Sequence, residues 1–219
     1  MKSYKIHLIR HGETEANEKG LYIGHTDLPL SAAGLQGLLR LRGEACYPGA
    51  ARFFTSPLTR CRQTLEVLYP HCRQEIADGL AECDFGEWEG KSAAALQNDP
   101  RFGEWIAGKR ADIPGGEAAA DFQTRVTEAF AGIVQELMKS GDTEAVVCTH
   151  GGSSCCLWRR MHCRTSKCTA GQPLRARGSP CGSPRHCGCG SRWRSSPVSF
   201  RSRRGKPSRR RLPAAAEKN

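Results

Sequence analysis

The stretch KIHLIRHG, residues 5–12, decides the fold and raises the first functional question. Its first five residues, KIHLI, form a short and mostly apolar run, which is typical of a buried strand, and Gly12 ends the strand. Arg10 and His11 stand side by side where the strand meets this glycine. A guanidinium and an imidazole at a strand end predict a polar site, provided that other segments bring partners to the same place.

Further strands and helices alternate along the chain. Residues 51–57 (ARFFTSP) and 144–152 (EAVVCTHGG) are apolar strands that stop at a Ser-Pro pair and at glycines. Helical periodicity follows Ser31 and Asp121, which we interpret as N-caps, and a further helix is expected to begin near Thr59. This alternation predicts an α/β fold, a three-layer α/β/α sandwich around a largely parallel sheet.

The charge is divided unevenly between two parts of the chain. Residues 155–219 hold 14 Arg, 3 Lys and one acid, a net charge of +16, whereas residues 1–154 hold 16 basic and 21 acidic residues, a net charge of −5. A chain of 219 residues allows one sizeable domain, or one domain with a tail, and the charge division favours the second. We therefore expect a folded domain at 1–153 and a basic, low-order tail at 154–219.

The sequence predicts a cytoplasmic protein with no membrane partner. No run reaches the roughly 18 apolar residues that a membrane span needs. The start, MKSYKIHLIRHG, lacks the long apolar segment of a signal peptide. The five cysteines of residues 1–154 have no pair spacing, which is typical of reduced cytosolic cysteines.

Three polar clusters, RHG, TSPLTR and THGG, each follow directly on a predicted strand. In open α/β sheets the ligand site forms at the carboxyl ends of the strands, so these clusters should meet at one edge. We expect Arg10, His11, Arg60 and His150 to lie together there. The other histidines, His7 and His25, together with Arg62 and Cys148, are interpreted as structural or rim residues.

A pocket of this composition favours phosphate chemistry. Guanidinium groups match phosphate oxygens, and backbone N–H groups at Gly12 and Gly151 would add donors. A neutral imidazole nitrogen of His11 can attack phosphorus and form a covalent intermediate, while the arginines stabilise the charge. We expect no metal and no cofactor at this pocket.

The leaving oxygen of such a reaction needs a proton, which predicts a nearby carboxyl group. The glycine-punctuated loop GLAECDFGEWEG (79–90) supplies Glu82, Asp84, Glu87 and Glu89. A carboxyl group beside phosphate has its pKa raised by the like charge, which suits a general acid. The residue types alone leave the choice among these acids open.

Four motifs in order, LIRHGETEAN, TSPLTRCRQT, AECDFGEWEG and VVCTHGG, resemble the histidine phosphatase superfamily, also called phosphoglycerate mutase-like, over residues 5–152. The resemblance implies a phosphoglycerate mutase-like fold, with His11 as the nucleophile that becomes phosphohistidine and Glu82 as the proton donor. It implies a phosphate or substrate site formed by Arg10, Asn17, Arg60, His150 and Gly151.

The short AECDFGEWEG loop and a later stretch resemble the phosphatase branch, and in particular alpha-ribazole phosphatases of cobalamin synthesis. The later stretch carries Trp105, Pro114 to Glu117, Phe122, Arg125 and Val126. This implies hydrolysis of a small phosphorylated metabolite, with alpha-ribazole 5′-phosphate as the candidate substrate. Two alternatives stay open. One is a phosphoglycerate mutase, and the other is an inactive phosphatase-like domain whose basic tail binds nucleic acid.

The segment after about residue 153 has almost no acid, few large aliphatic residues and no clear period, so it cannot bury enough surface to fold alone. It can be a basic arm for nucleic acid or an anionic surface, a metal site built from His186, Cys187 and Cys189, or an out-of-frame translation. We favour the third. Residues 157–171 can be encoded by codons that, translated in the neighbouring reading frame, give the sequence LMAAYALPDQQMYRW. This alternative sequence is typical of an apolar helix followed by a polar turn.

We predict that the DNA across the codons for Gly152 to Leu157 has gained or lost a base, which sequencing of this segment tests. An out-of-frame tail would remove native elements that cover the sheet, so we expect low solubility and weak activity of the chain. An intact frame would contradict the hypothesis and make a nucleic-acid binding assay of residues 154–219 the next measurement.

Overall fold

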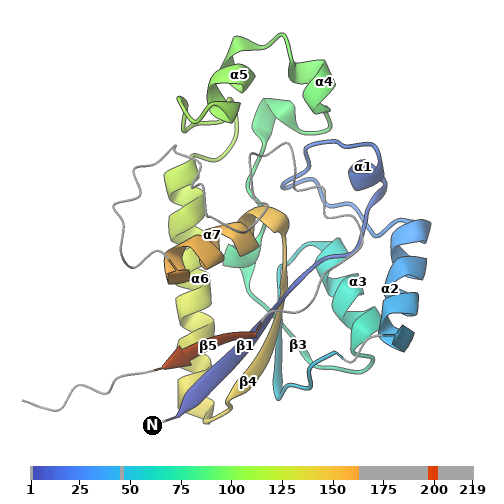
Figure 1. Ribbon diagram of the computed structural model, residues 1–219, viewed down its shortest axis with the longest axis vertical. Helices are drawn as coiled ribbons and strands as arrows, with labels where there is room; N and C mark the ends of the chain where they lie inside the picture. Colours follow the sequence, from blue (N-terminus) through green and yellow to red (C-terminus); the bar gives the residue numbers. More distant parts are fainter. Residues whose placement is uncertain (1, 45–46, 163–196, 202–219) are drawn as a thin grey trace, which may run out of the picture.

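The computed structural model describes residues 2–44, 47–162 and 197–201. Its sheet has the order β3-β2-β4-β1-β5 (Figure 1). The pairs β3–β2, β2–β4 and β4–β1 are parallel, whereas β5 is antiparallel to β1. The strands are β1 (Ser3–Arg10), β2 (Arg52–Thr55), β3 (Gln74–Ile76), β4 (Glu144–Thr149) and β5 (Pro197–Arg201).

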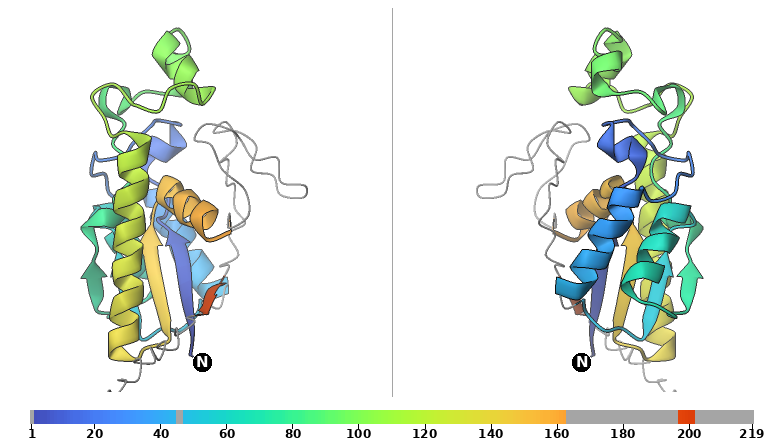
Figure 2. Two further views of the ribbon diagram at one scale, coloured as in Figure 1. Left: turned by 90° about the vertical axis from the view of Figure 1, so that its left-hand side faces the viewer. Right: turned by 90° about the vertical axis from the view of Figure 1, so that its right-hand side faces the viewer.

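Helices cover both faces of the sheet, which makes the three layers (Figure 2). One face carries α2 and α3, where Leu38 and Leu65 pack on Val146 of β4. The other face carries α6 and α7, where Leu137 packs on Val147. The helices are α2 (Ala32–Glu44), α3 (Thr59–Leu68), α6 (Ala119–Ser140) and α7 (Gly151–His162). This α/β sandwich confirms the fold class expected from the sequence.

A smaller group of elements lies beyond the carboxyl ends of the strands (Figure 1). It contains α1 (Glu15–Glu18), α4 (Ala93–Leu96), α5 (Pro100–Ile106) and the short 3₁₀ turn η2 (Gly86–Trp88). The turn η1 (Asp78–Leu80) packs instead on the main core through Leu80. The part formed by α4, α5 and η2 has its own aromatic core, whose rings are Tyr22, Phe85, Trp88, Phe102 and Trp105.

The strands at 51–57 and 144–152 and the helices after Ser31 and at Thr59 lie close to where the sequence predicts them. The assignment of Asp121 as an N-cap is wrong. Helix α6 begins at Ala119, because the alanines before Asp121 have high helix propensity and extend the helix backwards. Asp121 lies instead in the first turn, where a carboxylate is favourable.

Helix α7 crosses the predicted boundary at residue 153 and continues to His162, although we expected no helical period there. Leu157 of this helix is buried against Phe122 and Val126 of α6. The division of the chain at this boundary stays a prediction. Most of the basic tail, including the alternative metal site at residues 186–189, lies outside the described residues.

Within the described part of the chain, no helix is long and apolar enough to cross a membrane. Cys148 is completely buried in β4, as its place in an apolar strand indicates. His7 is also buried, on β1, and its pKa is lowered by burial.

Leu65→Ala should lower the free energy of unfolding by about 2–5 kcal/mol, because it leaves a cavity between α3 and the sheet where Leu65 is fully buried. Leu41→Ala on α2 is the control, since that side chain is 44% exposed and should change stability by less than about 0.5 kcal/mol. Thermal unfolding of both variants checks this, and equal melting temperatures would contradict the packing described.

Candidate active site

The three polar clusters meet at the carboxyl ends of the parallel strands, as the sequence predicts. His11 follows β1, Ser56 follows β2 and His150 follows β4. The rings of His11 and His150 have centroids 5.1 Å apart, and the Nε2 atom of His150 lies 2.8 Å from the Ser56 hydroxyl oxygen. Parallel pairing therefore places residues that are far apart in the sequence side by side.

Arg60, in the first turn of α3, lies beneath this cluster and is only 2% exposed. Its Nη1 and Nη2 atoms donate to the carbonyls of Thr26 and Gly24, at 3.0 and 2.8 Å. Its Nε atom donates to Nδ1 of His150 at 3.4 Å. Burial lowers the pKa of Arg60, although a guanidinium stays charged in proteins. Two of its five N–H groups remain for a further acceptor.

Arg10, the last residue of β1, has a buried Nε atom with no hydrogen-bond partner among the described residues. A Cβ atom on Gly151 would lie 3.7 Å from this guanidinium, so Arg10 lies against the first residue of α7. Within the described ranges, neither Arg10 nor Arg60 forms an ion pair with a carboxylate. Two guanidiniums that form no ion pair with a carboxylate, of which Arg10 lies against the start of α7, have a composition that suits an anion.

The tautomer of His11 follows from its surroundings. Its Nδ1 atom lies 2.6 Å from the carbonyl oxygen of Gly12. A carbonyl only accepts, so Nδ1 carries the proton and Nε2 carries the lone pair. Burial lowers the pKa of His11 to about 3; the bond to Gly12 opposes this shift, and the charges of Arg60 and Arg10 add to it. The imidazole is therefore neutral at neutral pH.

His150 is completely buried, and both of its ring nitrogens contact protein atoms. Because Nδ1 accepts from Arg60, Nε2 carries the proton in the neutral ring and donates to Ser56. Burial, followed by the proximity of His11 and Arg60, lowers the pKa of His150 well below its usual value. A bond from this ring to a phosphate, which the sequence resemblance implies, would require one of these partners to be exchanged.

Glu82 is the acid that joins the histidine cluster. Its Oε1 and Oε2 atoms accept from the backbone N–H groups of Cys83 and Gly152, each at 3.0 Å. A Cβ atom on Gly152 would lie 2.4 Å from Glu82 Oε1, so a glycine is required there. Burial raises the pKa of Glu82, while the two N–H groups and the nearby arginines Arg60 and Arg10 oppose the rise.

The competing acids of this loop have other partners. Asp84 accepts from the backbone of its own turn and lies 3.7 Å from His25. Glu87 forms an exposed ion pair with Arg101. Glu89 accepts from backbone N–H groups in two loops. Glu82, Asp84, Glu87 and Glu89 therefore occupy four different environments.

Asn17 ends up in a capping box at α1, where its amide oxygen accepts from the backbone N–H and the hydroxyl of Thr14. This leaves the amide nitrogen as the group that can donate to an anion. Gly12 differs from the expectation, because its N–H donates to the Thr64 hydroxyl at 2.9 Å and so does not line an anion site. Gly152 and Ser56 are not among the predicted site residues, yet Gly152 contacts Glu82 and Ser56 contacts His150.

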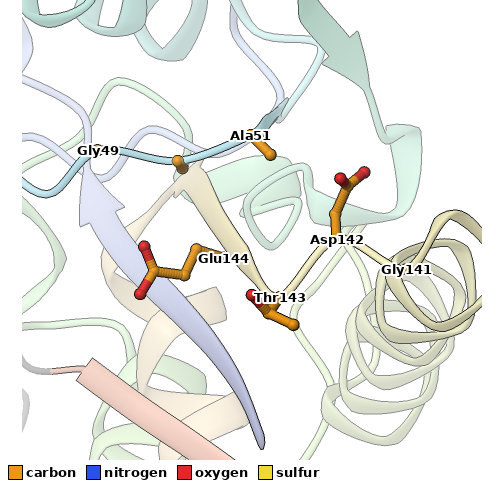
Figure 3. A pocket seen from close by; sticks show the side chains of 7 residues that line it. Gly49, Ala51, Gly141, Asp142, Thr143 and Glu144 are labelled. Carbon is orange, nitrogen blue, oxygen red and sulfur yellow. The ribbon is translucent and has the colours of Figure 1, made fainter. Parts of the chain in front are cut away.

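Two further features of the described residues bear on metal and anion binding. No group of three or more His, Cys, Asp or Glu side chains in them could hold a metal ion. A hollow at the opposite end of β4, lined by residues 49–51 and 141–144, carries the carboxylates of Asp142 and Glu144, which pair with Arg52 and Lys5 (Figure 3). It does not suit an anion.

The family is established by comparison with known proteins. The sequence model of the histidine phosphatase superfamily, branch 1, matches residues 6–169. The chain belongs to this superfamily.

The chain is similar to proteins named as mutases and to proteins named as phosphatases. A curated relative from Salmonella paratyphi C, named "Probable phosphoglycerate mutase GpmB", is 28% identical over 158 residues, which cover 70% of this chain and 72% of the relative. The solved alpha-ribazole phosphatase from Shigella flexneri superposes with a TM-score of 0.64 at 28% identity, covering 72% of this chain and 79% of that one. The solved protein TTHB049 from Thermus thermophilus gives a TM-score of 0.59 at 32% identity, covering 72% and 85%.

The His11 ring should not take up a proton between about pH 8 and pH 4, because its pKa is lowered to about 3. The unfolded chain protonates this residue near pH 6.5. This imidazole therefore makes the folded state less stable as the pH falls from about 6.5 towards 3. NMR of the histidine ring nitrogens, assigned with His11→Ala, checks this, and a midpoint near pH 6.5 would contradict it.

Proposed function

We propose that this protein hydrolyses a small phosphate monoester through a phosphohistidine intermediate on His11. The observation that carries the proposal is a pair of guanidiniums, Arg10 and Arg60, that form no ion pair with a carboxylate among the described residues and lie beside a neutral His11 whose lone pair is on Nε2. The phosphate dianion would supply an anionic partner for these two guanidinium groups. No metal or cofactor enters this proposal.

Binding of the phosphate group would use donors that converge from separate segments. Arg10 and the remaining N–H groups of Arg60 would donate to its oxygens, together with Asn17, His150 and the backbone N–H of Gly151. Guanidinium–phosphate hydrogen bonds are charge-assisted and roughly twice as strong as neutral ones. The same donors stabilise the charge on the equatorial oxygens while the phosphoryl group is transferred.

In the first step, His11 Nε2 attacks phosphorus, and the bond from phosphorus to the leaving oxygen breaks. The ring becomes a phosphorylated imidazolium whose Nδ1–H still donates to the carbonyl of Gly12, a bond that strengthens as the ring becomes cationic. Glu82 gives its proton to the leaving alcohol oxygen. Burial raises the pKa of Glu82, which helps this carboxyl group hold a proton at moderate pH.

In the second step, a water molecule attacks the phosphoryl group while the Glu82 carboxylate takes a proton from it. The bond between His11 Nε2 and phosphorus breaks, inorganic phosphate leaves, and both side chains return to their starting states. The same carboxyl group thus serves as acid and then as base.

The particular substrate is proposed from likeness alone. The fold resembles the alpha-ribazole phosphatase from Shigella flexneri, which supports alpha-ribazole 5′-phosphate as the candidate. The likeness to GpmB supports a second candidate, a phosphoglycerate mutase that returns the phosphoryl group to the product. An inactive domain with a nucleic-acid-binding tail stays an alternative that depends on residues outside the described ranges. A cytoplasmic location stays a prediction.

The two enzyme activities are separated by their products. We expect alpha-ribazole 5′-phosphate to release inorganic phosphate, and 3-phosphoglycerate to give no 2-phosphoglycerate. Conversion of 3-phosphoglycerate to 2-phosphoglycerate without free phosphate would contradict the phosphatase assignment.

His11→Ala should lower turnover by about 10⁴-fold or more, since it removes the nucleophile. His71→Asn is the control. His71 is an exposed histidine at a left-handed turn, a backbone conformation that Asn tolerates. Steady-state rates of both variants check the proposal, and turnover by His11→Ala close to that of the unchanged protein would refute it.

A further inference from the structure

We propose that Arg125 is a positioning residue that holds the Glu82 loop in place for proton transfer. This inference rests on the proposed function, because it concerns the acid of that reaction. Arg125 lies on α6, is distant from Glu82 in the sequence, and has no place in the chemistry itself.

Arg125 binds the backbone of the loop from the side of α6. Its Nη1 atom donates to the carbonyls of Gly79 and Ala81, at 3.0 and 3.1 Å. Its Nη2 atom donates to the carbonyl of Glu82 itself at 3.3 Å. A single guanidinium therefore fixes three carbonyl groups of a four-residue segment.

A carboxylate fixes the guanidinium in turn. Glu117 accepts from Nε and Nη2 of Arg125, at 2.9 and 2.7 Å, in a two-pronged ion pair. Its side chain is 16% exposed. All five N–H groups of Arg125 are thereby used. Because Glu117 balances its charge, we infer that Arg125 acts on Glu82 through position more than through electrostatics.

The loop needs such a clamp because η1 ends at Leu80, just before Glu82. The other hydrogen bonds that hold this loop come from β4 and the start of α7. The Thr149 hydroxyl donates to the carbonyl of Leu80, and Gly152 N–H donates to the Glu82 carboxylate. Arg125 thus holds the backbone of Glu82 from one side while β4 and the start of α7 hold it from the other.

The loop also lies close to α6, which makes the clamp rigid. A Cβ atom on Gly79 would lie 2.7 Å from the Cβ of Ala129 and 3.1 Å from the Arg125 carbonyl oxygen. There is no space between the two segments for the loop to shift towards the helix. Loss of the guanidinium removes the side-chain donor of the Gly79 and Glu82 carbonyl groups, while the Ala81 carbonyl keeps the hydroxyl of Ser153 as a donor. The loop can then move only away from α6.

A displaced acid has a kinetic signature that a general loss of stability lacks. A general acid matters most when the leaving oxygen is strongly basic, as in phenyl phosphate, and matters little for p-nitrophenyl phosphate, whose leaving group departs as a stable anion. The parameter kcat/KM includes formation of the phosphoenzyme, the step that needs the acid. The ratio of kcat/KM for phenyl phosphate to kcat/KM for p-nitrophenyl phosphate therefore reports the position of Glu82.

The experiment measures this ratio for the full chain and for Arg125→Met. We expect kcat/KM for phenyl phosphate to fall by about 100-fold, since a 1 Å misplacement of a catalytic group can cost about 100-fold in rate. We expect kcat/KM for p-nitrophenyl phosphate to fall by less than about threefold, because its leaving group needs little help from the acid. Arg125→Lys should recover part of the loss, because an ammonium group can still donate to the loop carbonyls.

Arg52→Met is the matched control. Arg52 also forms a two-pronged pair, with Glu75, and its side chain is 22% exposed compared with 27% for Arg125. It lies at the opposite end of the sheet from Glu82, at the start of β2. Loss of the Arg52 guanidinium should change the stability of the fold without changing the ratio of kcat/KM for the two substrates.

Glu82→Gln separates the failure of this inference from the failure of the proposed function. Suppose that Glu82→Gln lowers the ratio, whereas Arg125→Met lowers kcat/KM equally for the two substrates or for neither of them. The positioning role is then overturned while the acid role stands. If Glu82→Gln leaves the ratio unchanged, the acid role fails, and the positioning role fails with it.

A milder variant covers the case in which Arg125→Met does not fold. Glu117→Gln keeps the arginine and weakens only the ion pair that orients it. It should shift the ratio in the same direction by a smaller factor, with circular dichroism confirming a folded chain. An unchanged ratio in a folded Glu117→Gln variant would overturn the clamp as described.

Discussion

The buried guanidinium of Arg60 is the constraint on which the rest of the site depends. It is almost fully removed from water, yet within the described residues only neutral groups accept from it, the carbonyls of Gly24 and Thr26 and the ring of His150. A buried cation held by neutral acceptors is costly unless an anion completes its surroundings. This arrangement ties the loop after α1 to α3 and to the end of β4, and it leaves two N–H groups of Arg60 for the phosphate that we propose.

The remaining groups follow from that positive field. The charges of Arg10 and Arg60 add to burial in keeping His11 neutral, so its lone pair is available without a separate base. Glu82 is buried as well, but burial raises its pKa and so favours its proton. Glycine at position 152 lets the carboxyl group approach the start of α7. One buried environment therefore keeps the His11 imidazole neutral and raises the pKa of Glu82, which are the two conditions that the proposed reaction needs.

The sequence predicts the parallel strands and their polar ends well, since apolar runs such as residues 144–152 carry a strong signal. It does not predict β3, α4 or α5, which are too short to show a clear period. The place of Asn17 and the partner of Gly12 depend on tertiary hydrogen bonds that local pattern cannot reveal. The positioning role of Arg125 has no local sequence signal, because its contacts join two segments that are distant in the sequence.

The most direct test of the central claim is to identify the nitrogen that carries the phosphoryl group. The chain is mixed with substrate, quenched in alkali, and analysed by ³¹P NMR and by mass spectrometry of the peptide that contains His11. The tautomer fixed by Gly12 predicts phosphorylation at Nε2 of His11 and none in His11→Ala. A phosphoryl group on Nδ1, on another residue, or on no residue during active turnover would contradict the account.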